Sequence, residues 1–557
     1  MCKYCAFLAL LLLFFVVPPS LAIDDVTPAD RDTLEQRQKA LLEQARQQRE
    51  SLENAADLNI PATTATTADG PCFPVHHLAF SDATHLPAGD KADLRRRYQN
   101  RCLNLTDINH AVRETTNHYL THGYITSRAY LQEQDLAGGT LTISVSEGTL
   151  EAIELDGETP PALDMAFPGL TGRILNLRDL EQGMEQLNRL PSQQITIDIQ
   201  PGKQPGSAIA VLKRAPHTLP VEFSIAADNS GQKSTGREQL SASLALDNPL
   251  RLADRWWLTA GRDGAFSHRY GSRALSGGLS LPYGYWTLAY QYAWNDFFQP
   301  IPIGNNAYPY TGQSAAHRLS INNTLYRDGK QKLALEGALN RRRTENRLAG
   351  ERLGVNSPTL SSASVGLNYS ASLAGGYFTF NPVLSRGLRA WSATNDAGEL
   401  PRAEFRKLAL SASYFYPLAP SLYFLASAYG QTTPDNLYAG ERISLGGEYS
   451  VRGFKEQTLT GNRGLYWRNE LNWSFATLPL LGDLSLTAAL DSGWIAGQTG
   501  QADGGNMTGA ALGLSAASRR INQAISLGVP LHFPHELHPD NAAVYWQVNL
   551  PVSAFFR

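Results

Sequence analysis

Four consecutive residues, Val451-Arg452-Gly453-Phe454, are the most informative of this chain, and Arg452 is the one that can do polar chemistry. A guanidinium is planar and can donate two parallel hydrogen bonds to one carboxylate. A charged residue followed by glycine and an aromatic residue, within a strand-patterned region, indicates a loop that folds back inside rather than a surface tip. In a lumen Arg452 would need an acidic or carbonyl partner, because an unpaired buried charge is costly. The alternative is an arginine on an extracellular loop.

Motifs of catalysis and cofactor binding are missing from the sequence. It contains no H-E-x-x-H metal motif, no G-x-S-x-G nucleophile turn and no phosphate-binding loop with its lysine. His76-His77 is interpreted as a strand pair rather than a metal site, and the arginine runs at 95–97 and 341–343 as solvated or headgroup-facing charge. The net charge of −3 argues against a general nucleic-acid binder. We therefore expect no enzyme, no cofactor, no metal site and no nucleic-acid partner.

The first 22 residues have the three parts of a secretory signal peptide. Lys3 supplies the positive charge, and residues 6–17 form an apolar segment too short to span a bilayer. Ser20-Leu21-Ala22 places small residues at −3 and −1, so we expect residues 1–22 to be removed. The alternative is a short membrane anchor.

Export determines which cysteines remain. Cys2 and Cys5 leave with the signal peptide, so the mature chain keeps Cys72 and Cys102. Exported proteins with two remaining cysteines usually pair them. We expect a disulfide that contributes about 3–4 kcal/mol in the loop-closure description; two free thiols are the alternative.

Residues 23–57 are expected to form a helix, followed by a polar linker at 58–71. Thr27 can cap the helix, Pro28 suits its first position, and Asp30 favours its first turn. The apolar stripe is thin and consists of Leu34, Leu41, Ala45 and Leu52. Such a helix cannot form a core and needs solvent or a water-filled pore around it.

Two successive α/β units follow, at 72–149 and 150–215. The first is expected to contain a strand at 73–80, a helix from Thr106 to a stop at Gly123, and strands at 124–131 and 141–145. The second is expected to repeat this plan, with a strand at 150–155, a helix from Asn176 that ends before Pro191, and two strands that contain Ile195, Ile197 and Ile199, then Ile209 and Val211.

Residues 216–557 lack helical periodicity and read as strands separated by polar or glycine-rich turns. Residues 283–294 alternate aromatic or apolar with small or polar side chains, as a lipid-facing strand requires. The segment around Asp328-Gly329 reads as the turn of a hairpin. At about 20 residues per strand and connection, this region allows roughly sixteen strands of a transmembrane antiparallel β-barrel. A soluble β-sandwich or propeller is the alternative.

Several motifs resemble one family. Leu445 to Phe454 resembles the lumen-loop signature of the outer-membrane polypeptide-transport superfamily, in particular the two-partner secretion transporters of the haemolysin-activator type. Gly123 to Leu131 with Gln134-Asp135-Leu136 resembles the first polypeptide-transport-associated (POTRA) domain of that family, and Leu187 to Ser192 with Pro201-Gly202 the second. Barrel segments such as Tyr466 to Leu471 match as well, so the resemblance covers nearly the whole mature chain.

The resemblance implies an outer-membrane translocator with sixteen barrel strands and periplasmic POTRA domains. It also implies that the N-terminal helix plugs the pore, and that residues 446–462 form a lumen loop. Asp491, within Leu490-Asp491-Ser492-Gly493, matches the lumen-facing aspartate that pairs with the loop arginine, so a gate of Val451, Arg452, Gly453, Phe454 and Asp491 is expected. Leu490 stands near a position where relatives often carry an aromatic residue.

The implied partners are outer-membrane lipids and one large unfolded exoprotein, such as a haemolysin, adhesin or contact-dependent toxin, which passage through the barrel could also activate. An outer-membrane protein insertase of the same superfamily is the first alternative; such proteins carry a different number of POTRA domains and lack the plug helix. A diffusion porin is the second, but a porin has no use for periplasmic docking domains.

Overall fold

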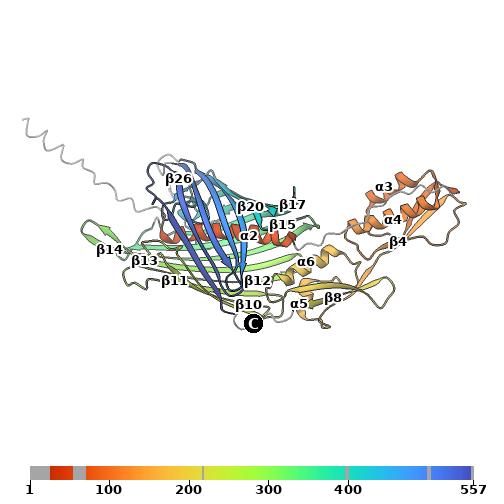
Figure 1. The fold of residues 1–557 in the computed structure, drawn as a ribbon, viewed down its shortest axis with the longest axis horizontal. Helices are drawn as coiled ribbons and strands as arrows, with labels where there is room; N and C mark the ends of the chain where they lie inside the picture. Colours follow the sequence, from red (N-terminus) through yellow and green to blue (C-terminus); the bar gives the residue numbers. More distant parts are fainter. Residues whose placement is uncertain are drawn as a thin grey trace, which may run out of the picture.

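A β-barrel enclosing one helix, with two small α/β units at one end, makes up the computed structural model of the chain (Figure 1). The structure describes residues 26–53, 71–215, 219–354, 356–394, 401–497 and 504–553. The predicted signal peptide and nearly all of the predicted linker lie outside the described residues. Among the described helices, none is long and apolar enough to cross a membrane.

Sixteen antiparallel strands within the described residues close the barrel, and its last strand pairs with its first. They are β9 (Val221–Asp228), β10 (Gln239–Asp247), β11 (Arg255–Asp263), β12 (Gly271–Tyr283), β13 (Trp286–Ile303), β14 (Asn306–Arg327), β15 (Gln331–Leu348), β17 (Thr359–Leu373), β18 (Gly376–Gly387), β19 (Arg406–Ala419), β20 (Leu422–Thr432), β23 (Gly464–Leu478), β24 (Gly482–Ile495), β25 (Gly505–Ala517), β26 (Asn522–His532) and β27 (Ala543–Pro551). The two-residue strand β16 (Glu351–Arg352) extends the tip of β15. Because the barrel of these strands is closed, each of them has a hydrogen-bonded neighbour on both sides, as strands in contact with hydrocarbon would need.

Alternate side chains point outward from the barrel, as the sequence pattern predicts. Trp286, Leu288 and Tyr290 on β13 are 47%, 42% and 37% exposed. The single strand predicted at 283–294 is nevertheless wrong at its start, because Tyr283 ends β12 and Gly284, with φ +56°, makes the turn. The hairpin predicted at Asp328 is confirmed, since β14 pairs with β15 across that turn.

The first α/β unit contains a three-stranded sheet and a separate strand pair. Its elements are β1 (Cys72–Val75), β2 (His77–Ser81), α3 (Ala88–Tyr98), β3 (Arg101–Asn104), α4 (Leu105–Thr121), β4 (Arg128–Tyr130) and β5 (Thr140–Ser146). In the sheet β5 is central, parallel to β2 and antiparallel to β4. The predicted strand at 73–80 is therefore two strands, and α3 was not predicted, because Leu94 and Tyr98 are its only buried residues.

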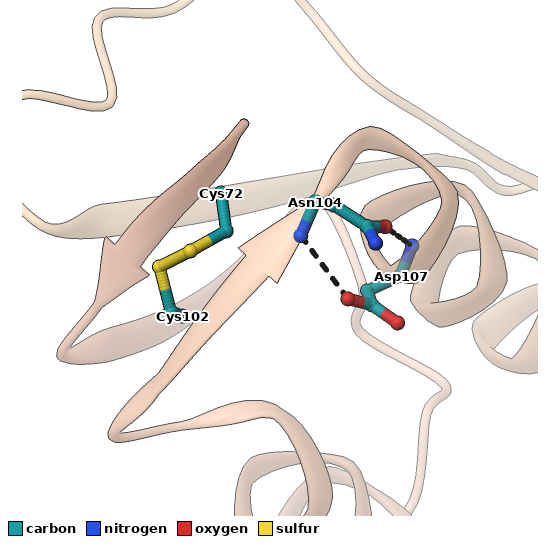
Figure 2. The surroundings of a disulfide bond; sticks show 4 residues. All are labelled: Cys72, Cys102, Asn104 and Asp107. Atoms are coloured by element: carbon teal, nitrogen blue, oxygen red, sulfur yellow. Dashed lines mark hydrogen bonds between the residues drawn. A yellow bond between two sulfur atoms is a disulfide. The ribbon is translucent and has the colours of Figure 1, made fainter. Parts of the chain in front are cut away.

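The disulfide Cys72–Cys102 joins β1 to β3 beside the start of α4 (Figure 2). Figure 2 also shows the reciprocal cap of that helix: Asn104 accepts from the backbone N–H of Asp107, and Asp107 accepts from that of Asn104. Both features fix the entry of α4 into the core, where Ile108 and Tyr119 are buried.

The second unit repeats this arrangement. It contains β6 (Thr149–Leu155), α5 (Pro161–Ala166), α6 (Leu177–Asn188), β7 (Ile195–Pro201) and β8 (Ser207–Arg214), with β8 central, parallel to β6 and antiparallel to β7. Asn176 caps α6, and the helix ends before Pro191, both as predicted. The six-residue α5 was not predicted, because it is too short to show periodicity.

The helix α2 (Pro28–Glu53) lies inside the barrel (Figure 1). Its start matches the prediction, since Thr27 Oγ1 accepts from the N–H of Asp30 at 3.2 Å. Leu34 and Leu52 are buried, yet most of the helix surface is polar. A polar helix is stable here because the barrel wall around it offers hydrogen-bond partners.

Candidate gate in the barrel lumen

The lumen loop, residues 446–462, folds back into the barrel between β20 and β23. The short strand β21 (Ile443–Leu445) precedes it and pairs antiparallel with β22 (Leu459–Gly461) inside it. Val451 and Phe454 are fully buried, in a cluster with Tyr429, Tyr466 and Met507. The tip of the loop is therefore held by packing as well as by its polar contacts.

Arg452 at the loop tip forms an ion pair with Asp491 on β24. Its Nε lies 2.6 Å from Oδ2 and its Nη2 2.7 Å from Oδ1, so the guanidinium is bidentate. The backbone N–H of Arg452 also donates to Oδ2, at 3.1 Å. Asp491 is completely buried. Three donors on one buried carboxylate fix both the position and the orientation of the loop tip.

A second acid and a second arginine complete the polar cluster. Glu470 Oε1 lies 2.9 Å from Arg452 Nη1 and 2.6 Å from Arg468 Nη2. Arg468 Nη1 also donates to the carbonyl of Glu448, at 2.8 Å. The cluster therefore holds two positive and two negative side chains, which satisfies the requirement that buried charges be paired.

Glycines let the loop tip lie flat against the wall. Gly453 has φ +99°, and a Cβ there would meet the backbone carbon of Val529 at 2.6 Å. A Cβ on Gly509 would lie 1.9 Å from the carbonyl oxygen of Arg452, and one on Gly528 2.6 Å from the nitrogen of Gly453. The two wall glycines, Gly509 and Gly528, belong to the site, although no sequence motif indicated them. Leu490 is 51% exposed on the outer face, so it takes no part in this packing.

The N-terminal half of α2 binds the lumen loop and the segment just before it. Arg37 donates to the carbonyl of Gly440 at 3.0 Å, and Gln38 to that of Ser444 at 2.8 Å. Arg31 reaches the carbonyl of Glu456 at 3.3 Å. The helix and the loop thus share direct contacts, so displacement of one disturbs the other.

The C-terminal half of α2 binds the barrel wall through side-chain amides. Gln44 donates to Asn368 on β17 at 2.9 Å, and Gln48 to Asn381 on β18 at 2.8 Å. Water can replace each neutral amide contact, so the helix is held without an apolar seal. None of these four residues was predicted from the sequence.

The middle arginine of the run at 341–343 is not solvated, contrary to expectation. Arg342 is 9% exposed, lies 3.8 Å from Asp30 of α2 and donates to the carbonyl of Gly440. The alternation of β15 explains this, because it turns Arg342 inward and its two neighbours outward. Nearby, Glu441 of the 3₁₀ helix η1 (Ala439–Glu441) pairs with Lys407 at 2.6 Å.

A cavity of about 1550 Å³ remains between α2 and the wall. Charged and amide side chains are prominent in its lining, among them Arg318, Glu336, Asn340, Asn368 and Arg468. Among the described residues, no group of three His, Cys, Asp or Glu side chains could hold a metal ion. The lumen is thus lined in part by charged and amide side chains, and it is narrowed by α2 and by the lumen loop.

Glu185 on α6 joins the second α/β unit, the barrel and α2. It pairs with Arg327 at 3.0 Å and with Lys332, and it accepts from Ser51 of α2 at 2.8 Å. Burial alone would raise the pKa of Glu185, but Lys332 and Arg327 outweigh burial and lower it to about 2. The carboxylate is therefore charged at neutral pH and binds all three parts at once.

Comparison with known proteins places the chain among transporters. Residues 206–516 match the family described as haemolysin secretion/activation protein ShlB/FhaC/HecB, residues 73–148 the ShlB-type POTRA domain, and residues 149–201 a POTRA domain. The chain is 44% identical over 530 residues to the outer membrane transporter CdiB of Dickeya dadantii, covering 94% of this chain and 95% of that one. It is 33% identical to the hemolysin transporter protein ShlB of Serratia marcescens, covering 84% and 82%.

Solved structures agree. CdiB from Escherichia coli superposes with a TM-score of 0.91 at 42% identity, over 94% of this chain and 99% of that one. CdiB from Acinetobacter baumannii, at 22% identity, shares the fold with a TM-score of 0.79. The barrel accordingly spans the outer membrane and the POTRA domains lie in the periplasm. The chain belongs to the haemolysin secretion/activation family of two-partner secretion outer-membrane transporters.

Proposed function

We propose that this transporter exports one large, unfolded exoprotein through its own barrel, and that α2 and the lumen loop form the gate. The observation that carries the proposal is the double closure of the lumen. Its passage is narrowed by α2, while Arg452 holds the lumen loop to Asp491. Because most contacts of α2 are polar, cargo and water can replace them without exposing an apolar core. Displacement of the loop tip must in addition uncover Val451 and Phe454, which are packed in an apolar cluster.

The cargo is recognised in the periplasm. Strands β4 and β7 each pair on one side only within the described sheets, so their other edges can accept an extended segment as an added strand. Such pairing uses backbone hydrogen bonds and makes little demand on the cargo sequence. The greater identity to CdiB, 44%, than to ShlB, 33%, favours a contact-dependent inhibitor over a haemolysin as the cargo.

Opening requires displacement of both α2 and the loop tip. Glu185 offers a route from docking to opening, because the POTRA helix α6 that carries it also contacts Ser51 of α2. The chain contains no nucleotide-binding motif, so net direction must come from folding of the cargo outside the cell. Cargo can shift the gate only by the difference in its affinity for the two states.

A secretion assay tests this function. Cells would co-express the chain with the large exoprotein encoded beside it, and wild type would be compared with Arg452→Ala at matched outer-membrane levels. Arg347→Ala, which removes an exposed arginine from an extracellular hairpin, is the control. Cargo in the medium with wild type and the control, and a sharp loss with Arg452→Ala, supports the proposal. No cargo release by wild type, with loss of other barrels on depletion, would show an insertase instead.

A further inference from the structure

An outward-facing groove lies at the extracellular ends of β17 to β20 and the start of β23. It has a volume of about 750 Å³. Its apolar part contains Val365, Leu384 and Leu408, which are 56%, 63% and 42% exposed. Arg386 and Arg406 lie above them, and Arg463 lies two strands beyond Leu408, just before β23; all three arginines are exposed. The groove therefore combines an apolar wall with a basic upper end.

Two arginines of this groove lie close enough to repel each other. Arg386 stands directly opposite Arg406 in the β18–β19 register, and Leu384 opposite Leu408. Like charges directly opposite on one face of a sheet are unfavourable. Neither Arg386 nor Arg463 forms an ion pair within the described part of the chain. An anion between the guanidiniums would remove the repulsion.

Only one carboxylate of the described residues reaches this cluster. Asp435, which is 5% exposed, lies 3.5 Å from Arg406 Nε and also 3.6 Å from Arg402 Nη1. One shared carboxylate cannot neutralise the arginines around it. The groove thus keeps an excess of positive charge that faces outward.

The height of the cluster fits the boundary between acyl chains and headgroups. Along β18 the outward side chains run upward from Phe378 through Phe380 and Leu384 to Arg386. Eight residues of a tilted strand rise roughly 20 Å, against an apolar band of about 25 Å in such barrels. Arginine stems lie along apolar surface while their heads reach the polar region. Arg386 therefore lies where lipid phosphates of the outer leaflet are found.

We propose that this groove binds one phosphorylated lipid of the outer leaflet. Its acyl chains lie on Val365, Leu384 and Leu408, and its phosphate accepts hydrogen bonds from Arg386, Arg406 and Arg463. Guanidiniums suit phosphate because they can bind two of its oxygens at once. The apolar wall of Val365, Leu384 and Leu408 below Arg386 and Arg406 selects a lipid over a soluble phosphate, since a free anion gains nothing from it.

Native mass spectrometry of the full-length protein in detergent, titrated with purified lipid A, tests the site. The variant Arg386→Gln/Arg406→Gln/Arg463→Gln should bind lipid A at least about tenfold more weakly, because each lost charge-assisted contact is worth about a factor of ten or more. The control Arg262→Gln/Arg269→Gln/Arg273→Gln changes net charge equally elsewhere on the extracellular side and should bind as wild type does. Dephosphorylated lipid A should bind wild type as weakly as lipid A binds the groove variant.

Folding of each variant is checked by heat-modifiable migration on gels. If the triple variant does not fold, the single variant Arg386→Gln replaces it and should show an intermediate loss of lipid A binding. Equal loss in the control would overturn the proposal in favour of diffuse charge. Undiminished binding by the folded triple variant would overturn it outright. Competition by inorganic phosphate as strong as by lipid A would show an anion site without a lipid.

Discussion

Replacement of Arg452 by alanine should free the tip of the lumen loop. The change removes two charge-assisted hydrogen bonds to Asp491, at 2.6 and 2.7 Å, and the contact with Glu470. The backbone donor of residue 452 and the pair of Glu470 with Arg468 remain. Asp491 would then stay buried with only one of its three donors.

The size of the effect follows from that loss. Removing one partner of a buried ion pair costs about 3–5 kcal/mol, because the other charge is left uncompensated. The cavity beside the cluster admits water, so the lower value of about 3 kcal/mol applies here. At 1.4 kcal/mol for each factor of ten, the open state of the loop tip should gain about 100-fold in population.

Hydrogen exchange measures this population directly, because local opening sets the exchange rate of a protected amide. In Arg452→Ala, amides of residues 451–454 should exchange about 100-fold faster than in wild type, while those of the strand β24 around residue 487 stay protected. The control Arg347→Ala removes an exposed pair worth about 0–1 kcal/mol and should leave the loop unchanged. Unaltered exchange at 451–454 in Arg452→Ala would refute the view that this ion pair holds the loop.

Three further predictions concern the POTRA domains. Glu185→Gln should weaken the hydrogen bond to Ser51 by about 1 kcal/mol and speed hydrogen exchange at the C-terminal end of α2 roughly fivefold. The exposed control Glu50→Gln should not change this exchange, and equal effects of the two variants would rule out a coupling role for Glu185. Replacing Cys72 and Cys102 together by serine should lower the unfolding free energy of the first POTRA domain by about 3–4 kcal/mol in pulse proteolysis, and a loss below about 1 kcal/mol would contradict this. Although burial opposes the shift, hydrogen bonds from His85, Thr84 and Tyr119 lower the pKa of Glu147 to about 2. Its stabilisation is therefore complete above the unfolded pKa of 4.5 and is lost as pH falls from about 5 toward 2. Pepsin pulse proteolysis should show this decline in wild type and a flatter one in Glu147→Gln.

The sequence predicts elements best where one face is apolar and the ends carry their own signals. The helix α6 shows both, with Leu180 and Leu187 buried and Asn176 as its cap. The helix α3 shows neither: it buries only Leu94 and Tyr98, and no side chain caps it. Alternation also fails at the end of β12, because Tyr283 and Trp286 continue the aromatic pattern across a turn.

The residues of the gate also differ in whether the sequence could indicate them. The partner of Arg452 lies 39 residues away, so no local rule could name Asp491; only the resemblance to a family implied it. The plug contacts of Gln44 and Gln48 join polar side chains to polar side chains and have no hydrophobic signature. Gly509 is part of the site because it has no Cβ, and the need for this appears only once the loop is seen to lie against the wall.

A reversible bridge between α2 and the barrel wall tests whether α2 must leave the lumen for cargo to pass. Cysteines in place of Gln48 and Asn381, whose side chains are in contact, can be joined by a bis-methanethiosulfonate spacer in intact cells and released by reductant. Cys72 and Cys102 are bonded to each other, so they do not compete for the reagent. Wild type with reductant controls for the opening of that native disulfide, and each single cysteine variant controls for labelling alone.

We expect the bridged transporter to release no more cargo than cells without the transporter, and reductant to restore release to the level of the wild type with reductant. Full secretion with the bridge intact would contradict this expectation, because the cargo would then leave while α2 remains in the barrel.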